Sequence, residues 1–187
     1  MTGRPTRVVV GATLLAGAVG LVRQRRESLR ARTALPPSEA PDRIAAFERL
    51  ARWIPGRPSS VRGRALVALW ASPLTIVGLA LALAAGARPR FDERLGCFIA
   101  RGVGGPSGRA LALVGADANT VGQVVLARSG RPSDVLLEHE AVHVRQAERL
   151  GPLLLPTYVI LGALRGYRAN PLERAARLGA ARVTGSA

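Results

Sequence analysis

LEHEAVHVRQ, residues 137–146, contains the pattern His-Glu-x-x-His at His139, Glu140 and His143. Positions i and i+4 of a helix lie on one face, about 40° apart, so the two imidazoles can bind one metal ion. The glutamate beside the first histidine is then placed to activate a water molecule on that metal. Because the chain has 2 histidines and both lie in this pattern, we predict a Zn²⁺ site. The alternative is a surface helix that happens to carry two histidines.

The residues on either side of the motif predict the helix itself. Ser133 or Asp134 can accept a hydrogen bond from a backbone N–H group of the first turn. Gly151 and Pro152 follow Leu150 and should end the helix there, since glycine favours C-terminal caps and proline cannot continue a helix. The motif is therefore expected on a helix that ends at about Leu150.

Two further polar residues can be placed by their angle from the histidines. Gln146 lies seven residues after His139, about −20° away, and therefore shares the face of the two imidazoles. Glu148 lies nine residues after His139, about 180° away, and so cannot be a ligand. We expect Glu148 to be a solvated charge near Arg145 or Arg149.

A catalytic zinc ion usually has three protein ligands, and no third histidine exists. We predict Glu173 as the third ligand. Asn170 fits the N-cap of a helix that begins at the proline after it, which puts Glu173 at the third helical position. A carboxylate there can instead close a capping box or pair with Arg177. Asp117 and Gln146 are the reserve candidates for the ligand.

His139-Glu140-x-x-His143, followed by Asn170-Pro171-x-Glu173, resembles the pattern of a gluzincin-type zinc metallopeptidase. The resemblance is strongest to small bacterial membrane-associated HExxH proteins and covers roughly residues 120–177. Further matching positions are Val144, Gln146, Leu150-Gly151-Pro152, Pro156 and Tyr158. It implies an α+β, zincin-like domain with a small antiparallel sheet beside the HExxH helix, and Zn²⁺ bound by the two histidines and Glu173.

The resemblance also implies peptide-bond cleavage by glutamate-assisted attack of zinc-bound water. Glu140 would take the proton of the water and pass it to the leaving amine. Because no histidine is left to stabilise the oxyanion, we expect Tyr158 or Tyr167 in that role, with Arg145 and Arg168 as weaker candidates. The alternative for both tyrosines is ordinary packing with a hydrogen-bonded hydroxyl group.

Gluzincins often carry a second acidic residue on the third-ligand helix, where it holds a ligand imidazole. This chain has the sequence RAAR at 174–177, so that partner must come from elsewhere. We expect Asn170, Asp117 or a backbone carbonyl group to hold the imidazole.

The composition indicates a partner with negative charge. The net charge is +15, and all 27 basic residues are arginine. Together with the apolar segments, this charge favours anionic membrane lipid. Aromatic residues make up 4% of the chain, which leaves no evident stacking platform for nucleic acid, so we expect none to bind. One cysteine, Cys97, excludes an internal disulfide.

Three apolar segments bear on a membrane location. Residues 65–87 are apolar throughout, long enough to cross a bilayer, and flanked by arginines; the alternative is a buried core helix. We interpret residues 8–22 as an uncleaved anchor or membrane-inserted helix, since arginines follow at once. Residues 152–164 are too short to span and contain a proline. They should pack under the zinc site or dip into the interface.

The connector at 24–64 should contain one helix, from Pro41-Asp42 to Ile54. This helix either lies on anionic lipid or packs on the catalytic domain.

Strands are expected at 97–103, 110–115 and 120–127, with a glycine-rich turn at 104–108. The resemblance implies that the last strand lies at the sheet edge, where it would bind an extended peptide by strand addition; the alternative is an ordinary hairpin strand.

These patterns predict three parts: an N-terminal membrane-associated helix and basic connector (1–64), a transmembrane helix (65–87), and a zincin-like catalytic domain (88–187). We expect a zinc metallopeptidase of the cell membrane that acts on peptide or protein substrates. The many charges of the motif helix favour work at the membrane surface. The arginine-rich connector should stay in the cytoplasm, which puts the catalytic domain on the extracytoplasmic side. The alternatives are a zinc-dependent hydrolase of a non-peptide amide and a non-catalytic membrane protein with a structural or vestigial metal site.

Overall fold

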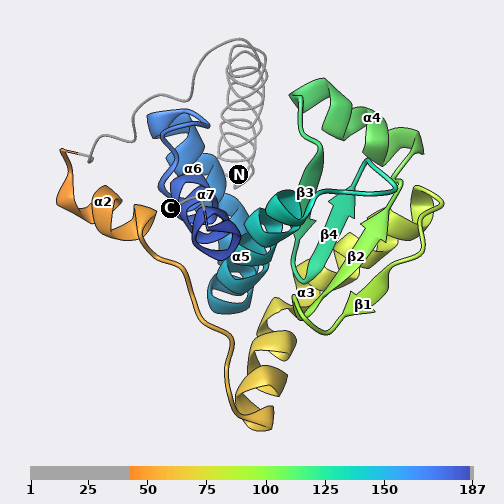
Figure 1. The fold of residues 1–187 in the computed structure, drawn as a ribbon, viewed down its shortest axis with the longest axis horizontal. Coiled ribbons are helices and arrows are strands. Elements are labelled where there is room, and N and C mark those ends of the chain that lie inside the picture. Colours follow the sequence, from red (N-terminus) through yellow and green to blue (C-terminus); the bar gives the residue numbers. More distant parts are fainter. Residues whose placement is uncertain (1–42, 186–187) are drawn as a thin grey trace, which may run out of the picture.

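The computed structural model describes residues 43–185, which form an α+β fold around a four-stranded mixed sheet of order β1-β2-β4-β3. The strands are β1 (Arg90–Asp92), β2 (Cys97–Arg101), β3 (Ala118–Val121) and β4 (Val124–Ala127). The predicted helix at 8–22 lies outside the described residues. Figure 1 shows the sheet on one side of the central helix α5 and the helices α6 and α7 on the other.

The two inner strands run parallel to each other, and each outer strand is antiparallel to its neighbour. The predicted all-antiparallel sheet is therefore wrong. Parallel strands need a crossover connection, and here it contains helix α4 (Gly105–Val114). The predicted turn at 104–108 and the predicted strand at 110–115 are also wrong, because helix α4 occupies this stretch. Alanine and leucine favour a helix over this stretch, and Pro106 suits its first turn.

The predicted strand over 120–127 is a hairpin of two strands. Val121 pairs with Val124, so Gly122 and Gln123 form a two-residue turn. Gly122 has a φ of 63°, which the first central position of such hairpin turns requires. Of these two strands, β4 lies inside the sheet and β3 lies at its edge, where the whole segment was predicted.

Helix α5 (Asp134–Leu150) carries the HExxH motif and packs on the sheet. It begins and ends as predicted: the Ser133 hydroxyl accepts a hydrogen bond from the Leu136 amide, and Gly151 follows the last turn. Its apolar face forms one buried cluster with the sheet, made of Leu137, Ala141 and Val144 with Cys97, Ile99 and Val125. This packing fixes which face of α5 is left for the histidines.

Two helices cover the side of α5 that faces away from the sheet: α6 (Leu154–Arg165), entered through the 3₁₀ turn η1 (Gly151–Leu153), and α7 (Pro171–Thr184). Pro156 lies in the first turn of α6, where its missing N–H costs no helical hydrogen bond. A Cβ atom on Gly179 would lie 2.5 Å from the Val142 side chain, so α7 and α5 are in close contact.

The helix expected in the connector is α2 (Ala45–Ala51), and it packs on α7. The Glu48 carboxylate accepts a hydrogen bond from Arg174, 3.1 Å away, and Phe47 and Leu50 pack on the cluster that contains Leu172. Of the two positions expected for this helix, the structure therefore shows the one packed on the C-terminal part of the chain.

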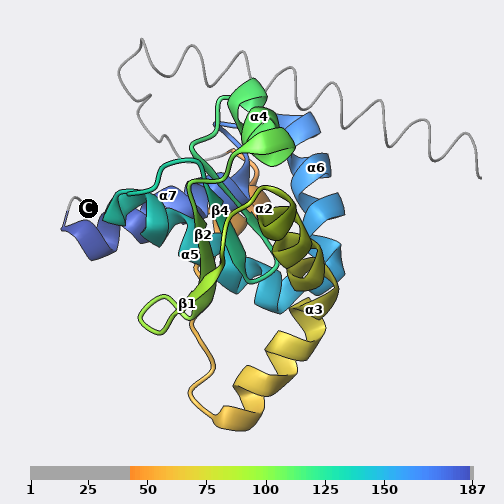
Figure 2. The same ribbon diagram turned by 90° about the vertical axis from the view of Figure 1, so that its right-hand side faces the viewer.

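Helix α3 (Val61–Ala84) is, among the described residues, the one helix long and apolar enough by length and composition to cross a membrane. Its N-terminal half projects from the body of the protein (Figure 2). One stripe is buried and consists mainly of small residues: Ala71, Thr75, Gly78 and Ala82. Large apolar residues on its other faces are exposed: Leu66, Leu69, Ile76 and Leu83. Within the most apolar 18-residue stretch of α3, 22% is buried. The core helix of a soluble domain is mostly buried, so α3 differs from such a helix.

The middle of α3 is held against the β3–β4 hairpin. A Cβ atom on Gly78 would lie 2.5 Å from the Val121 carbonyl oxygen, and one on Gly122 would collide with the backbone of Thr75. The Thr75 hydroxyl accepts a hydrogen bond from the Gln123 amide at 3.1 Å. Helix α3 therefore has a fixed position beside the edge strand of the sheet.

Gly78→Ala should destabilise the protein, because its methyl group has no space between α3 and the hairpin. Overpacking of this kind costs about 1–3 kcal/mol, which exceeds the gain of roughly 1 kcal/mol in helix propensity. Gly162→Ala in α6 is the matched control, since its Cβ would meet Asn170 at an ordinary 3.8 Å. Thermal unfolding in detergent should give Gly78→Ala the lower Tm. Equal values for the two variants would contradict this packing.

Candidate metal centre

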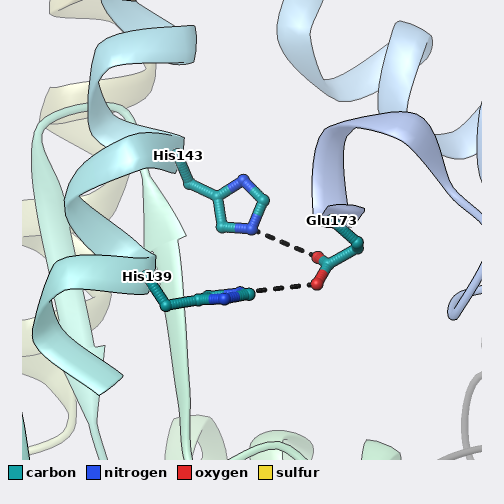
Figure 3. Close-up of side chains that lie close together, drawn as sticks. All are labelled: His139, His143 and Glu173. Atoms are coloured by element: carbon teal, nitrogen blue, oxygen red, sulfur yellow. Dashed lines mark ion pairs between the residues drawn. The ribbon is translucent and has the colours of Figure 1, made fainter. Parts of the chain in front are cut away.

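Three side chains from two helices point at one another at the centre of the fold. His139 and His143 project from α5 toward Glu173 in the first turn of α7 (Figure 3). Nε2 of His143 lies 3.2 Å from Oε1 of Glu173, and Nε2 of His139 lies 3.4 Å from Oε2. One ligand atom from each residue lies within 4.8 Å of the others. The predicted convergence of Glu173 with both imidazoles is confirmed, and the cluster can hold a metal ion.

The spacing and the unsatisfied atoms of this cluster fit a cation. Ligand atoms about 2.1 Å from a tetrahedral metal lie about 3.4 Å from one another, close to the two nitrogen–oxygen distances observed. Nε2 of His143 and Oε2 of Glu173 are buried, and neither has a hydrogen-bond partner among the described residues. Buried polar atoms are normally paired, so an unpaired nitrogen and an unpaired oxygen in one buried cluster fit the binding of a cation there.

Gln146 determines which nitrogen of His143 faces Glu173. Its Oε1 lies 2.8 Å from His143 Nδ1, and its Nε2 donates to the Leu172 carbonyl oxygen at 3.3 Å. Because the amide nitrogen is bound to a carbonyl group, Oε1 must be the acceptor, and Nδ1 must carry the proton. In the neutral ring, the lone pair is then on Nε2 and points toward Glu173, as in a metal-binding histidine.

A proton takes the place of the cation when the cluster holds no metal. Burial, the largest single effect, would lower the pKa of His143, but the charge and hydrogen bond of Glu173, with the smaller effects of Glu140 and Gln146, together raise the pKa to about 9. Burial alone would raise the pKa of Glu173, but the two histidines hold it well below its usual value. Metal binding near neutral pH must therefore displace a proton from His143.

Glu173 is not engaged in capping its own helix. Asn170 caps α7, accepting a hydrogen bond from the Leu172 amide at 3.0 Å. The Asn170 amide, which a capping-box glutamate would need, donates to the Tyr167 carbonyl oxygen at 3.2 Å. This leaves the Glu173 carboxylate free to face the histidines.

The expected partners of the ligand imidazole need correction. Asn170 holds α7 and α6 together, since its side chain also donates to the Tyr158 carbonyl oxygen. Asp117 is exposed and lies 3.6 Å from Arg128. Gln146 takes the role instead, although the sequence analysis considered it only as a reserve ligand. The position of Gln146 on the same helix face as the two histidines was the sequence signal that could have predicted this role.

Glu140 lines the same cavity as the cluster and is oriented by the edge strand. The Thr120 hydroxyl on β3 lies 2.7 Å from Oε2 of Glu140, and the glutamate side chain is buried. The sequence analysis missed Thr120 in this role, because a residue twenty positions upstream gives no local signal of the contact. This hydrogen bond leaves Oε1 of the carboxylate available for a ligand.

The two tyrosines predicted near the site both line this cavity. The Tyr158 hydroxyl donates to Oε1 of Glu173 at 2.7 Å, and burial together with the charge of Glu173 raises its pKa well above the usual value. The charge of Glu173, together with burial, also raises the pKa of Tyr167. Both hydroxyl groups therefore remain protonated donors. Arg145 and Arg168, the weaker candidates, are not among the described residues that line the cavity.

Two carboxylates on the other faces of α5 are buried and paired. Glu148 is 7% exposed and accepts a hydrogen bond from the Gln123 side chain at 2.7 Å, so its prediction as a solvated charge is wrong. The turn of the β3–β4 hairpin covers that side of the helix. Glu138 is also buried and forms an ion pair with Arg94. Helix α5 is thus a core helix.

Gln146→Met should keep the fold and weaken Zn²⁺ binding by about 10–100-fold, since it leaves the ring of His143 without its acceptor. Gln146→Glu retains an oxygen for Nδ1 and should keep more of the affinity. Competition with a fluorescent chelator measures both variants. Unchanged affinity in Gln146→Met would show that the glutamine does not position His143.

Comparison with known proteins gave no relative from which to take a function. The chain matches no protein-family model, no curated protein and no solved structure. The chemistry of the site therefore has to be argued from its own residues.

Proposed function

We propose that the protein is a membrane-associated, zinc-dependent peptidase. The observation that carries the proposal is that His139, His143 and Glu173 converge on one buried point in a cavity that Glu140 also lines. Two further observations support it: the cavity is lined by β3, an outer strand of the sheet among the described residues, and an apolar helix forms one of its walls.

The donor set favours zinc among the metals that the cluster can hold. Two imidazole nitrogens and one carboxylate oxygen are the ligands of one common type of catalytic zinc site, which leaves a position open for water or substrate. The charge would also balance, because the carboxylates of Glu140 and Glu173 would offset the charge of a divalent ion held by two imidazole nitrogens. When bound, zinc would polarise the substrate carbonyl group and activate a water molecule.

Glu140 acts as the general base. Its carboxylate takes a proton from the attacking water as oxygen bonds to the carbonyl carbon, and gives that proton to the amine when the carbon–nitrogen bond breaks. The hydrogen bond from Thr120 holds one carboxylate oxygen, so the proton moves through the other. Tyr158 or Tyr167 donates a hydrogen bond to the negative oxygen of the tetrahedral intermediate.

The position of β3 favours a peptide over a small amide. Asn119, Thr120 and Val121 line the cavity, and the outer edge of β3 pairs with no other strand in the part of the chain that the structure describes. An extended peptide can add to such an edge through main-chain hydrogen bonds. A small amide would leave these backbone groups unused.

Glu140→Gln should abolish hydrolysis and leave metal binding intact. The amide cannot accept the proton, which predicts a loss of at least about 10²-fold in kcat, while Zn²⁺ remains at about one ion per chain. Hydrolysis of a quenched fluorescent peptide library and metal analysis provide the two readouts. Loss of zinc along with activity would make Glu140 a ligand or a structural residue and would refute its role as base.

A membrane-spanning α3 places its ends on opposite sides of the bilayer. Cysteines introduced at the exposed positions Arg62 and Arg88, each in a Cys97→Ala background, should therefore react with an impermeant thiol reagent from opposite sides of sealed vesicles. Cys97 itself cannot report, since it is buried and burial raises its pKa to about 12. Labelling of both positions from one side would refute the span.

A further inference from the structure

The cavity at the metal cluster has a polar end and two apolar walls. It encloses about 480 Å³, and its charged lining residues, Glu140, Glu173 and the two histidines, lie at the metal end. The apolar walls come from α3 and α6: Leu74, Val77, Leu81, Leu154, Leu155 and Val159. The volume suits one or two large side chains beside a peptide backbone.

The apolar walls continue to the outside of the protein. Val77 and Leu81 on α3 are 49% and 38% exposed, and Leu155 on α6 is 60% exposed, although all three line the cavity. Ile76 on α3 and Ile160 on α6 do not line the cavity but are exposed as well. The rim between α3 and α6 is therefore apolar, and a group that enters there meets aliphatic side chains before it meets the metal ligands.

We propose that α3 and α6 select the substrate, and that it is a hydrophobic stretch of polypeptide with a large aliphatic or aromatic residue next to the scissile bond. This inference rests on the proposed peptidase function. The selected side chain packs on Val77, Leu81 and Leu155, and the backbone beside it runs along β3. Helix α3, the candidate membrane span, is thus also the specificity-determining wall of the site.

Two features of the cavity favour this occupant over others. An acyl chain could pack on the apolar walls, but it has no groups to pair with the outer edge of β3, which lines the same cavity. A peptide with a charged residue at this position would bury that charge against aliphatic walls, with no partner among the described lining residues outside the metal end. A hydrophobic peptide satisfies both the strand edge and the walls.

The test measures binding and does not depend on turnover. The full chain carrying Glu140→Gln, loaded with zinc in detergent, is titrated with two fluorescent decapeptides that differ only at the two central residues, Leu-Leu or Ser-Ser. The Leu-Leu peptide should bind at least about tenfold more tightly. Adding Val77→Trp, which fills the rim, should remove this preference. Ile76→Trp is the matched control: its neighbouring position is 65% exposed and is not among the described lining residues, so the preference should remain.

The outcomes separate this inference from the proposed function. Equal binding of both peptides, or loss of the preference in Ile76→Trp as well as Val77→Trp, would overturn the inference even if the wild-type protein hydrolyses peptides. Displacement of the Leu-Leu peptide by a single-chain lipid, with no displacement by an unlabelled copy of the peptide, would also overturn it in favour of an acyl-chain site. A preference that only Val77→Trp removes supports the inference, even if the wild-type protein cleaves neither peptide and the hydrolytic function fails.

Discussion

The structure depends on how a buried glutamate on one helix meets two imidazoles on another. Glu173 lies in the first turn of α7, and the histidines lie one turn apart on α5, so the cluster exists only while these helices keep their positions. Gln146 secures this arrangement by binding both His143 and the carbonyl group of Leu172, next to Glu173. The same amide thus fixes the proton on His143 and the distance between the helices. Because two buried atoms of the cluster have no hydrogen-bond partner among the described residues, cation binding and the packing of α5 against α7 depend on each other.

Helix α3 both lines the cavity of this site and is the candidate membrane span. Its buried small residues fit the β3–β4 hairpin, whereas its large apolar residues face outward or line the cavity. We expected the charges of α5 to favour work at the membrane surface, and three of its carboxylates, those of Glu138, Glu140 and Glu148, are buried with partners inside the protein. Helix α3 can therefore line the cavity, pack on the β3–β4 hairpin and cross a membrane, because each of these contacts uses a different face of the helix.

The elements that could be predicted from sequence were those with local signals. Helix α5 has a serine cap and a glycine stop, and α7 begins with Asn170 and a proline, so both helices and the geometry between the histidines follow from spacing alone. The convergence of Glu173 with them was predictable from the small number of candidate ligands. Helix α4 was missed because its alternating small and large residues look like a strand, although alanine and leucine favour a helix. The partners of Glu148 and Glu140 were missed because they come from the hairpin, through contacts that no local pattern encodes.

The proposed function requires that His139, His143 and Glu173 bind one zinc ion together. X-ray absorption at the zinc edge of the loaded protein, beside metal analysis of Glu173→Ala, measures this binding. We expect about one zinc per chain, with imidazole scattering from two histidines and an oxygen ligand at about 2.0–2.2 Å. Glu173→Ala should bind zinc more weakly and lose that oxygen. A protein that takes up no stoichiometric zinc, or whose zinc shows no imidazole ligands, would rule out this metal site.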